Sequence, residues 1–149
     1  MIYSVDVHVT AEGVHFVDSV RAPEKKEVIR LVQEDMRQEL VDLGVPVTIG
    51  GLTLTDMEDR FHRGGLPVVL ISSWAIYRER TPHWVLVTGF DQHFVYVNDP
   101  FVDEDEGETE MDSINMPIRR DQFERMARYG RVGLQAVVTV FAGTRSGDR

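Results

Sequence analysis

The segment 83–100 most constrains the fold of this chain, because it has the pattern of two β-strands joined by a tight turn. Each arm carries two valines at alternate positions, and β-branched residues in such alternation are typical of strands. The polar tripeptide Asp91-Gln92-His93 lies between the arms and is able to turn the chain. The sequence therefore predicts an antiparallel β-hairpin.

The ends of this hairpin carry a histidine and an aspartate. A turn centred on Asp91, or between Asp91 and Gln92, places His83 opposite Asp99 or Pro100. Directly opposed residues have Cβ atoms about 5 Å apart, so the imidazole can reach the carboxylate. Such a carboxylate fixes the histidine tautomer and stabilises the imidazolium. The alternative is an ordinary hairpin with a solvent-facing histidine and a turn-forming Asn-Asp-Pro.

The hairpin sequence resembles the His and Asp segments of the bacteriocin-processing, double-glycine cysteine peptidases of bacteria, the C39-like group, which are papain-like in fold. The resemblance rests on segments 82–91 and 95–100 and extends to about Phe141. It includes four shorter segments, at 16–20, 43–47, 69–72 and 123–130. The resemblance implies that His83 is the general base and that Asp99 is the acid that orients it.

The chain departs from this family because it contains no cysteine. In the family, a Gln and the nucleophilic Cys precede these segments, whereas here Met1 leads directly into a predicted strand over 2–9. We therefore expect a single peptidase-like domain over 1–142 without the N-terminal helical part, and a loose tail over 143–149. Ser72 and Ser73 end an apolar strand, where bonding to nearby backbone is favoured over a nucleophilic role.

The remaining pattern predicts an α+β fold, the sheet half of a papain-like peptidase, with a mostly antiparallel sheet and two or three helices. Apolar residues at spacings of four and three predict a helix from Pro23 to Leu43, ended by Gly44. Thr53 with Asp56, or Thr55 with Glu58, is able to cap a second helix. A third helix is predicted over 121–129. Further strands are predicted over 14–20, 45–49, 66–72, 114–118 and 134–141, with 66–72 central and covered on both faces.

Composition excludes several functional classes. The net charge of -9 argues against nucleic-acid binding, which depends on cationic side chains. Neither a membrane-spanning run nor a signal-peptide pattern is present, so we expect a cytoplasmic protein without membrane contact. We expect no cofactor and no metal, because the five histidines lack the spacing of a zinc site. The acidic segment 103–112 lacks the spacing of a calcium loop and is read as a solvated loop.

Two hypotheses about function follow. In the first, the chain is the His/Asp part of a C39-like cysteine peptidase, inactive alone, and His83 deprotonates a thiol supplied by a missing N-terminal segment. In the second, it is a non-catalytic module, a pseudo-peptidase, that binds a peptide or a protein. Loss of the N-terminal helix would expose apolar sheet surface, which favours a homodimer or docking to another chain.

Overall fold

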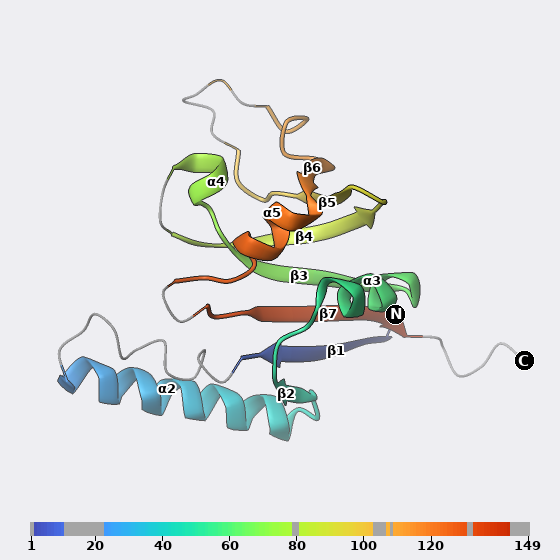
Figure 1. The fold of residues 1–149 in the computed structure, drawn as a ribbon. Helices are drawn as coiled ribbons and strands as arrows, with labels where there is room; N and C mark the ends of the chain where they lie inside the picture. Colours follow the sequence, from blue (N-terminus) through green and yellow to red (C-terminus); the bar gives the residue numbers. More distant parts are fainter. Residues whose placement is uncertain are drawn as a thin grey trace, which may run out of the picture.

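The computed structural model describes residues 2–10, 23–78, 81–102, 107, 109–130 and 133–143. These residues form an α+β fold with a seven-stranded sheet in the order β2-β1-β7-β3-β4-β5-β6 (Figure 1). The strands are β1 (Ile2–Val9), β2 (Val47–Ile49), β3 (Gly65–Ser72), β4 (Pro82–Phe90), β5 (Phe94–Asn98), β6 (Met116–Arg119) and β7 (Ala136–Gly143). The helices are α2 (Pro23–Asp42), α3 (Leu54–His62), α4 (Trp74–Tyr77) and α5 (Arg120–Met126).

The expected mostly antiparallel sheet is confirmed. Within the described residues, β1 and β2 form a parallel pair, and every other neighbouring pair of strands is antiparallel. The single-turn helix α4 lies in a segment for which the sequence predicted neither a helix nor a strand. The helix predicted over 121–129 is shorter, because Tyr129 pairs with Leu134 in an isolated bridge instead. The strand predicted over 14–20 lies outside the described residues.

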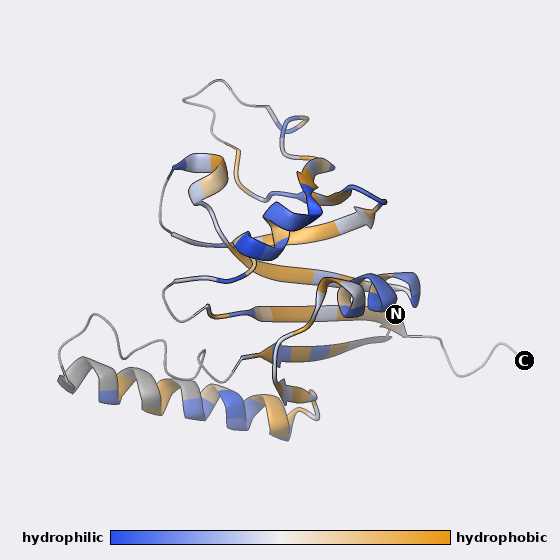
Figure 2. Cartoon of the chain, in the orientation of Figure 1, coloured by the Kyte–Doolittle hydropathy of each residue, from blue (hydrophilic) through white to orange (hydrophobic). Residues whose placement is uncertain are grey.

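The hydrophobic core lies between one face of the sheet and the helices α3 and α5, which cross in front of the strands in Figure 1. Alternate strand residues point into this core, as the period of two requires. Figure 2 shows the central strands as mostly hydrophobic and the helices as mixed. The core includes Met57, Val69, Ile71, Val85, Val87, Val95, Val97, Phe123, Met126 and Val137.

Strand β3 is central, as predicted, but it is not covered on both faces. Val69 and Ile71 are fully buried on the core side, whereas Leu66 on the other side is 46% exposed. The expectation failed because an apolar run identifies a strand and says nothing about which elements cover it. On this second face Leu66 is exposed and Val68 is partly exposed, whereas Leu70 is buried, so within the described residues the face is open at the start of β3.

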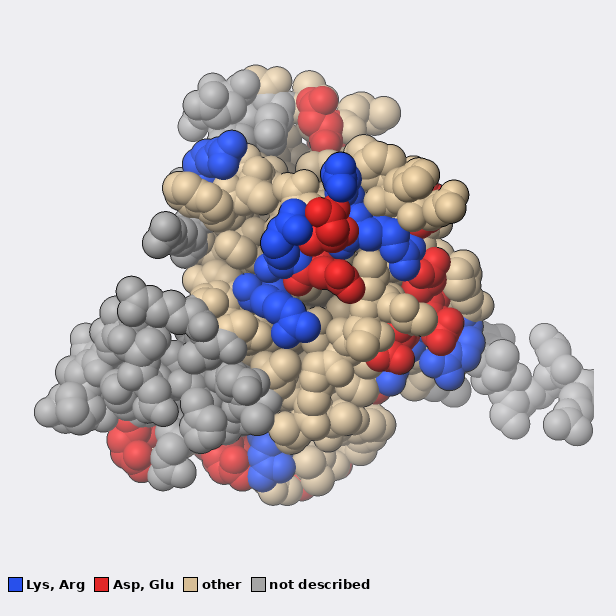
Figure 3. Space-filling view, viewed as in Figure 1, with Lys and Arg blue, Asp and Glu red and all other residues tan. Residues whose placement is uncertain are grey.

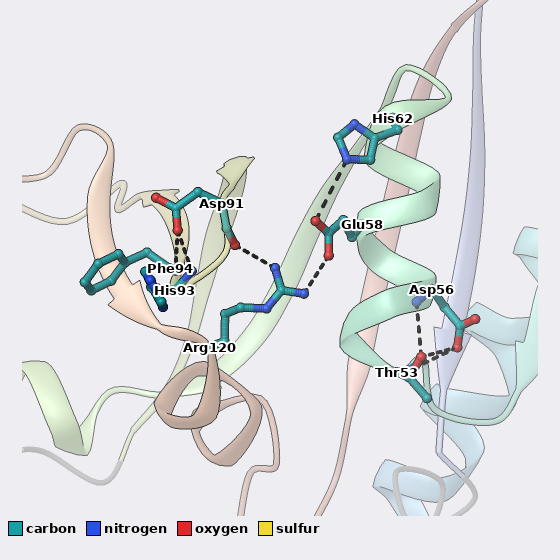
Figure 4. A network of polar contacts seen from close by, with 8 residues as sticks. All are labelled: Thr53, Asp56, Glu58, His62, Asp91, His93, Phe94 and Arg120. Carbon is teal, nitrogen blue, oxygen red and sulfur yellow. Dashed lines mark hydrogen bonds and ion pairs between the residues drawn. The ribbon is translucent and has the colours of Figure 1, made fainter.

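The turn that begins α3 confirms one of the two predicted caps. The Thr53 hydroxyl accepts a hydrogen bond from the Asp56 backbone N–H at 3.1 Å, and the Thr53 backbone N–H donates to Asp56 Oδ2 at 3.0 Å (Figure 4). This reciprocal arrangement is a capping box. The bonds from Thr53 lower the pKa of the Asp56 carboxyl. The capping box fixes the residue at which α3 starts. The starting residue sets which side of the helix is apolar, and that side packs against β3.

The hairpin of β4 and β5 is present, but its register differs from the prediction. The turn is centred later than expected, because Asp91 Oδ1 accepts the backbone N–H groups of His93 and Phe94, both at 2.7 Å. A register shift also falls between Val87 and Gly89. On the N-terminal side of that shift, Leu86 pairs with Asn98. Continuing this register, Asp99 lies opposite Val85, and His83 lies on the same strand two residues before Val85.

Candidate active site

His83 and Asp99 meet on the core face of the hairpin. His83 Nε2 lies 2.6 Å from Asp99 Oδ1, although the two residues are diagonal neighbours rather than directly opposed. The contact forms because His83 shares a face with Val85, two residues along the same strand. The Asp99 side chain is fully buried, whereas the His83 side chain is 19% exposed. The pair therefore has a buried acid and a solvent-accessible base.

The Asp99 carboxylate is held by donors on both oxygens. The Tyr77 hydroxyl donates to Oδ2 at 2.9 Å, and the Phe101 backbone N–H donates to Oδ1 at 2.8 Å. The Asp99 backbone N–H donates to the Ser113 carbonyl at 2.8 Å, which fixes the main chain at this position. A buried carboxylate needs such partners to remain ionised. The surroundings of Asp99 therefore suit a charged acceptor for the imidazole.

The histidine ring is oriented by an aromatic neighbour as well as by the carboxylate. Tyr77 packs edge-on against His83 with ring centroids 5.9 Å apart, and Phe101 packs against Tyr77 at 5.2 Å. An ionised carboxylate accepts hydrogen bonds only, so the contact assigns the proton to His83 Nε2. Within the described residues, Nδ1 of His83 makes no hydrogen bond. Nδ1 is then the unprotonated nitrogen, the form that a general base requires.

Sequence reasoning missed Tyr77 and Phe101. Tyr77 lies in a segment without a predicted helix or strand, and its contact with Asp99 spans 22 positions of the chain. Such a contact has no signature in local sequence. Phe101 follows Pro100 directly, and the bond from its backbone to Asp99 has the spacing of an Asx turn, which an aspartate before proline favours.

The two candidate hydroxyls of this region belong to Ser72 and Ser73, at the end of β3. Ser73 is buried, and its Oγ lies 2.8 Å from Thr81 Oγ1 and 3.1 Å from the Thr81 carbonyl. Ser72 pairs with Pro82 across β3 and β4. The Ser73 contacts match the expected role of a hydroxyl that satisfies nearby backbone at a strand end.

A groove lies between α4 and α5, next to the strand pair that carries His83. Its volume is about 290 Å³, near the lower limit of ligand pockets. The lining combines the exposed Trp74 with the buried Met126 and the charged Arg125. Figure 3 shows basic and acidic side chains gathered over this part of the surface. Asp121 of α5 forms exposed pairs with Arg125 of the same helix and with Arg119 at the end of β6. The full lining is Ser72, Trp74, Ala75, Gln122, Arg125 and Met126.

A polar network attaches the hairpin turn to both helices (Figure 4). Arg120 of α5 donates to the Asp91 carbonyl at 2.9 Å and to Glu58 Oε2 of α3 at 2.5 Å. His62 lies 3.9 Å from the other Glu58 oxygen. The hydrogen bond from Arg120 lowers the pKa of the Glu58 carboxyl. The network fixes the hairpin relative to the helices that cover the core.

A second polar cluster joins α3 to β1. Arg60 forms an ion pair with Asp6, and its other guanidinium nitrogen lies 2.8 Å from His8 Nε2. Since the guanidinium only donates, His8 Nε2 accepts and the ring is neutral. Burial and the nearby Arg60 charge lower the pKa of His8 below its ordinary value of 6.5. One oxygen of Asp6 is buried without a hydrogen-bond partner.

The acidic segment is described only in part. Asp112 Oδ2 accepts hydrogen bonds from the backbone and the hydroxyl of Thr109, both at 2.8 Å. Among the described residues, no group of three or more His, Asp or Glu side chains is placed to hold a metal ion. None of the helices in the described ranges is both long and apolar enough to cross a membrane.

Comparison with known proteins identifies the family. A family model described as Peptidase_C39 like family matches residues 2–141. Neither a curated protein nor a solved structure matches the chain. The match includes the hairpin with His83 and Asp99 and covers nearly the whole sequence. This chain therefore belongs to the Peptidase_C39 like family.

Proposed function

We propose that His83 and Asp99 are the general base and the orienting acid of a cysteine-peptidase site. The observation that carries the proposal is the 2.6 Å contact between His83 Nε2 and the fully buried Asp99 carboxylate. It leaves Nδ1 of the partly exposed His83 side chain to accept a proton. Membership of the Peptidase_C39 like family is a second, independent support.

The proposed chemistry is acyl transfer with a thiolate nucleophile. Nδ1 of His83 removes the thiol proton, the thiolate attacks the peptide carbonyl, and the resulting imidazolium then protonates the leaving amine. Asp99 stabilises the imidazolium between these steps. These 149 residues contain no cysteine, so the thiol in this scheme comes from outside them. We therefore expect the chain alone not to hydrolyse peptides.

The first experiment measures hydrolysis and the histidine tautomer together. Fluorogenic peptides should be cleaved no faster with the chain than in buffer. Two-bond ¹H–¹⁵N spectra should show His83 protonated at Nε2, and Asp99→Asn should remove this preference. His93, which is exposed in the hairpin turn, serves as the control and should give the same spectrum in both proteins. A His83 ring protonated at Nδ1, or peptide turnover that survives His83→Ala, would contradict the proposal.

A non-catalytic peptide-binding role is the second candidate, and the groove between α4 and α5 favours it. Its apolar and aromatic lining with one guanidinium suits an extended peptide that carries an apolar side chain and a carboxylate. Titration of ¹⁵N-labelled chain with a peptide library should shift resonances of Trp74 and Gln122. Binding that survives both His83→Ala and Trp74→Ala would place the peptide elsewhere. Binding lost only in Trp74→Ala would support recognition without catalysis.

A further inference from the structure

Helix α2 exposes an apolar stripe to solvent. Val28, Val32 and Met36 follow one another at spacings of four, which places them on one side of the helix. Their exposed fractions are 60%, 46% and 61%. The helix ends in a local turn, in which the Val45 backbone N–H donates to the Leu40 carbonyl at 2.8 Å. Figure 2 shows hydrophobic and hydrophilic segments alternating along the coloured part of α2.

The second face of the sheet is also apolar and incompletely covered. Strand pairing brings together Val5 with Val140 and Val68 with Leu86, and all four side chains are partly exposed. Leu66 and Trp84 on the same face are 46% and 41% exposed. The face is formed by Val5, Val7, Val9, Leu66, Val68, Leu70, Trp84, Leu86, Ala136, Val138 and Val140. Contiguous apolar surface of this kind marks an interaction site.

We propose that a second copy of this chain covers both surfaces, with α2 of each copy lying on the open sheet face of the other. Two complementary surfaces on one chain allow a two-fold dimer in which each contact is made twice. A helix of 20 residues is about 30 Å long and about 10 Å wide, so its footprint is about 300 Å². The dimer contains two such contacts, and each contact buries two surfaces of about 300 Å². The total buried area is therefore about 1,200 Å², the lower limit for a stable interface.

The charge of the chain sets the conditions for this dimer. Each copy has a net charge of -9, and α2 carries the exposed acids Glu34, Asp35 and Glu39. Repulsion between copies is screened by salt, whereas apolar contact is not weakened by it. The dimer should therefore be stronger at about 0.5 M salt than at about 0.05 M salt. The dimer does not depend on the proposed peptidase site.

The first experiment measures the mass of the chain by size-exclusion chromatography with light scattering. The wild-type chain should have twice its monomer mass of 17.0 kDa. Val32→Glu should give the monomer mass. Val41→Glu is the matched control, because Val41 is 49% exposed and lies nine residues on, on the opposite side of the helix. A wild-type monomer at all concentrations, or equal effects of the two substitutions, would overturn the proposal.

The second experiment tests which surfaces meet. Leu66→Glu on the sheet face should also give a monomer, and circular dichroism should show that each variant remains folded. Mixing Val32→Glu with Leu66→Glu should give dimers at high protein concentration, where neither variant alone does, because one of the two helix-to-sheet contacts is then intact. If Leu66→Glu stays dimeric, the helices pair with each other and the helix-to-sheet arrangement is wrong.

Discussion

Tyr77 and His83 hold opposite oxygens of one buried carboxylate, Oδ2 and Oδ1 of Asp99. The hydroxyl of Tyr77 therefore prevents rotation of the carboxylate away from the imidazole, while its ring packs edge-on against His83. The two roles of Tyr77 can be separated, because phenylalanine keeps the ring and removes the donor.

Tyr77→Phe should lower the free energy of unfolding by about 1–2 kcal/mol, the cost of leaving a charged acceptor with one partner fewer. Urea denaturation measures this loss, and the ¹⁵N spectrum of His83 should show a weaker preference for Nε2–H. Tyr96→Phe is the control, because Tyr96 also donates to an aspartate, Asp91, but in the exposed turn. Equal and negligible effects of both substitutions would contradict the positioning role of Tyr77.

Thr53→Ala should destabilise the chain by about 1 kcal/mol, because it removes the hydroxyl that accepts the Asp56 backbone N–H at the start of α3. Thr55→Ala should change the free energy of unfolding by less than about 0.5 kcal/mol, since an exposed helix position tolerates alanine. Thermal or urea denaturation compares the two variants. A larger effect at Thr55 would show that the helix begins two residues later.

Stability should depend on pH through His8. Its pKa is lowered in the folded state by burial and by Arg60, so the unfolded chain binds more protons as the pH falls. The contribution is fully present above pH 6.5 and is lost as the pH falls through the lowered folded value. His8→Gln should flatten this part of the urea-denaturation profile, whereas His93→Gln in the exposed turn should leave it unchanged. An unaltered profile in His8→Gln would assign the dependence to another group.

The Arg120–Glu58 pair should contribute a coupling energy of about 0.5–1 kcal/mol in a double-mutant cycle of Arg120→Met and Glu58→Gln. Both side chains are only 26% exposed, and the pair connects α5 to α3. The same cycle at Arg119 and Asp121, where the side chains are 71% and 51% exposed, should give no measurable coupling. Similar coupling at both pairs would mean that burial does not distinguish them.

Much of the fold could be predicted from local pattern. The hairpin, the capping box and the helix ended by Gly44 each follow from residues close together in sequence, and the structure confirms them. The contact of His83 with Asp99 was also reached from the sequence, although the pairing register was wrong. The register depended on the Asp91 side chain that caps the turn, which strand propensity does not describe.

Features that depend on distant contacts could not be predicted. Tyr77 reaches Asp99 from a helix of one turn, and the open face of β3 depends on where α2 and α3 lie. An apolar residue has the same local signal whether its neighbour comes from the same chain or from another. The sequence therefore identifies strands and caps better than it identifies the covering of a sheet.

The irregularity between Val87 and Gly89 determines the side of the sheet on which His83 stands. Phe90 packs against the core and so does Val87, although they are three positions apart, an odd spacing that strict alternation would place on opposite faces. The extra residue shifts the phase of the strand by one, and Val85 and His83 follow in the new phase. Without this phase shift the imidazole would project from the opposite face, beyond the reach of the buried carboxylate.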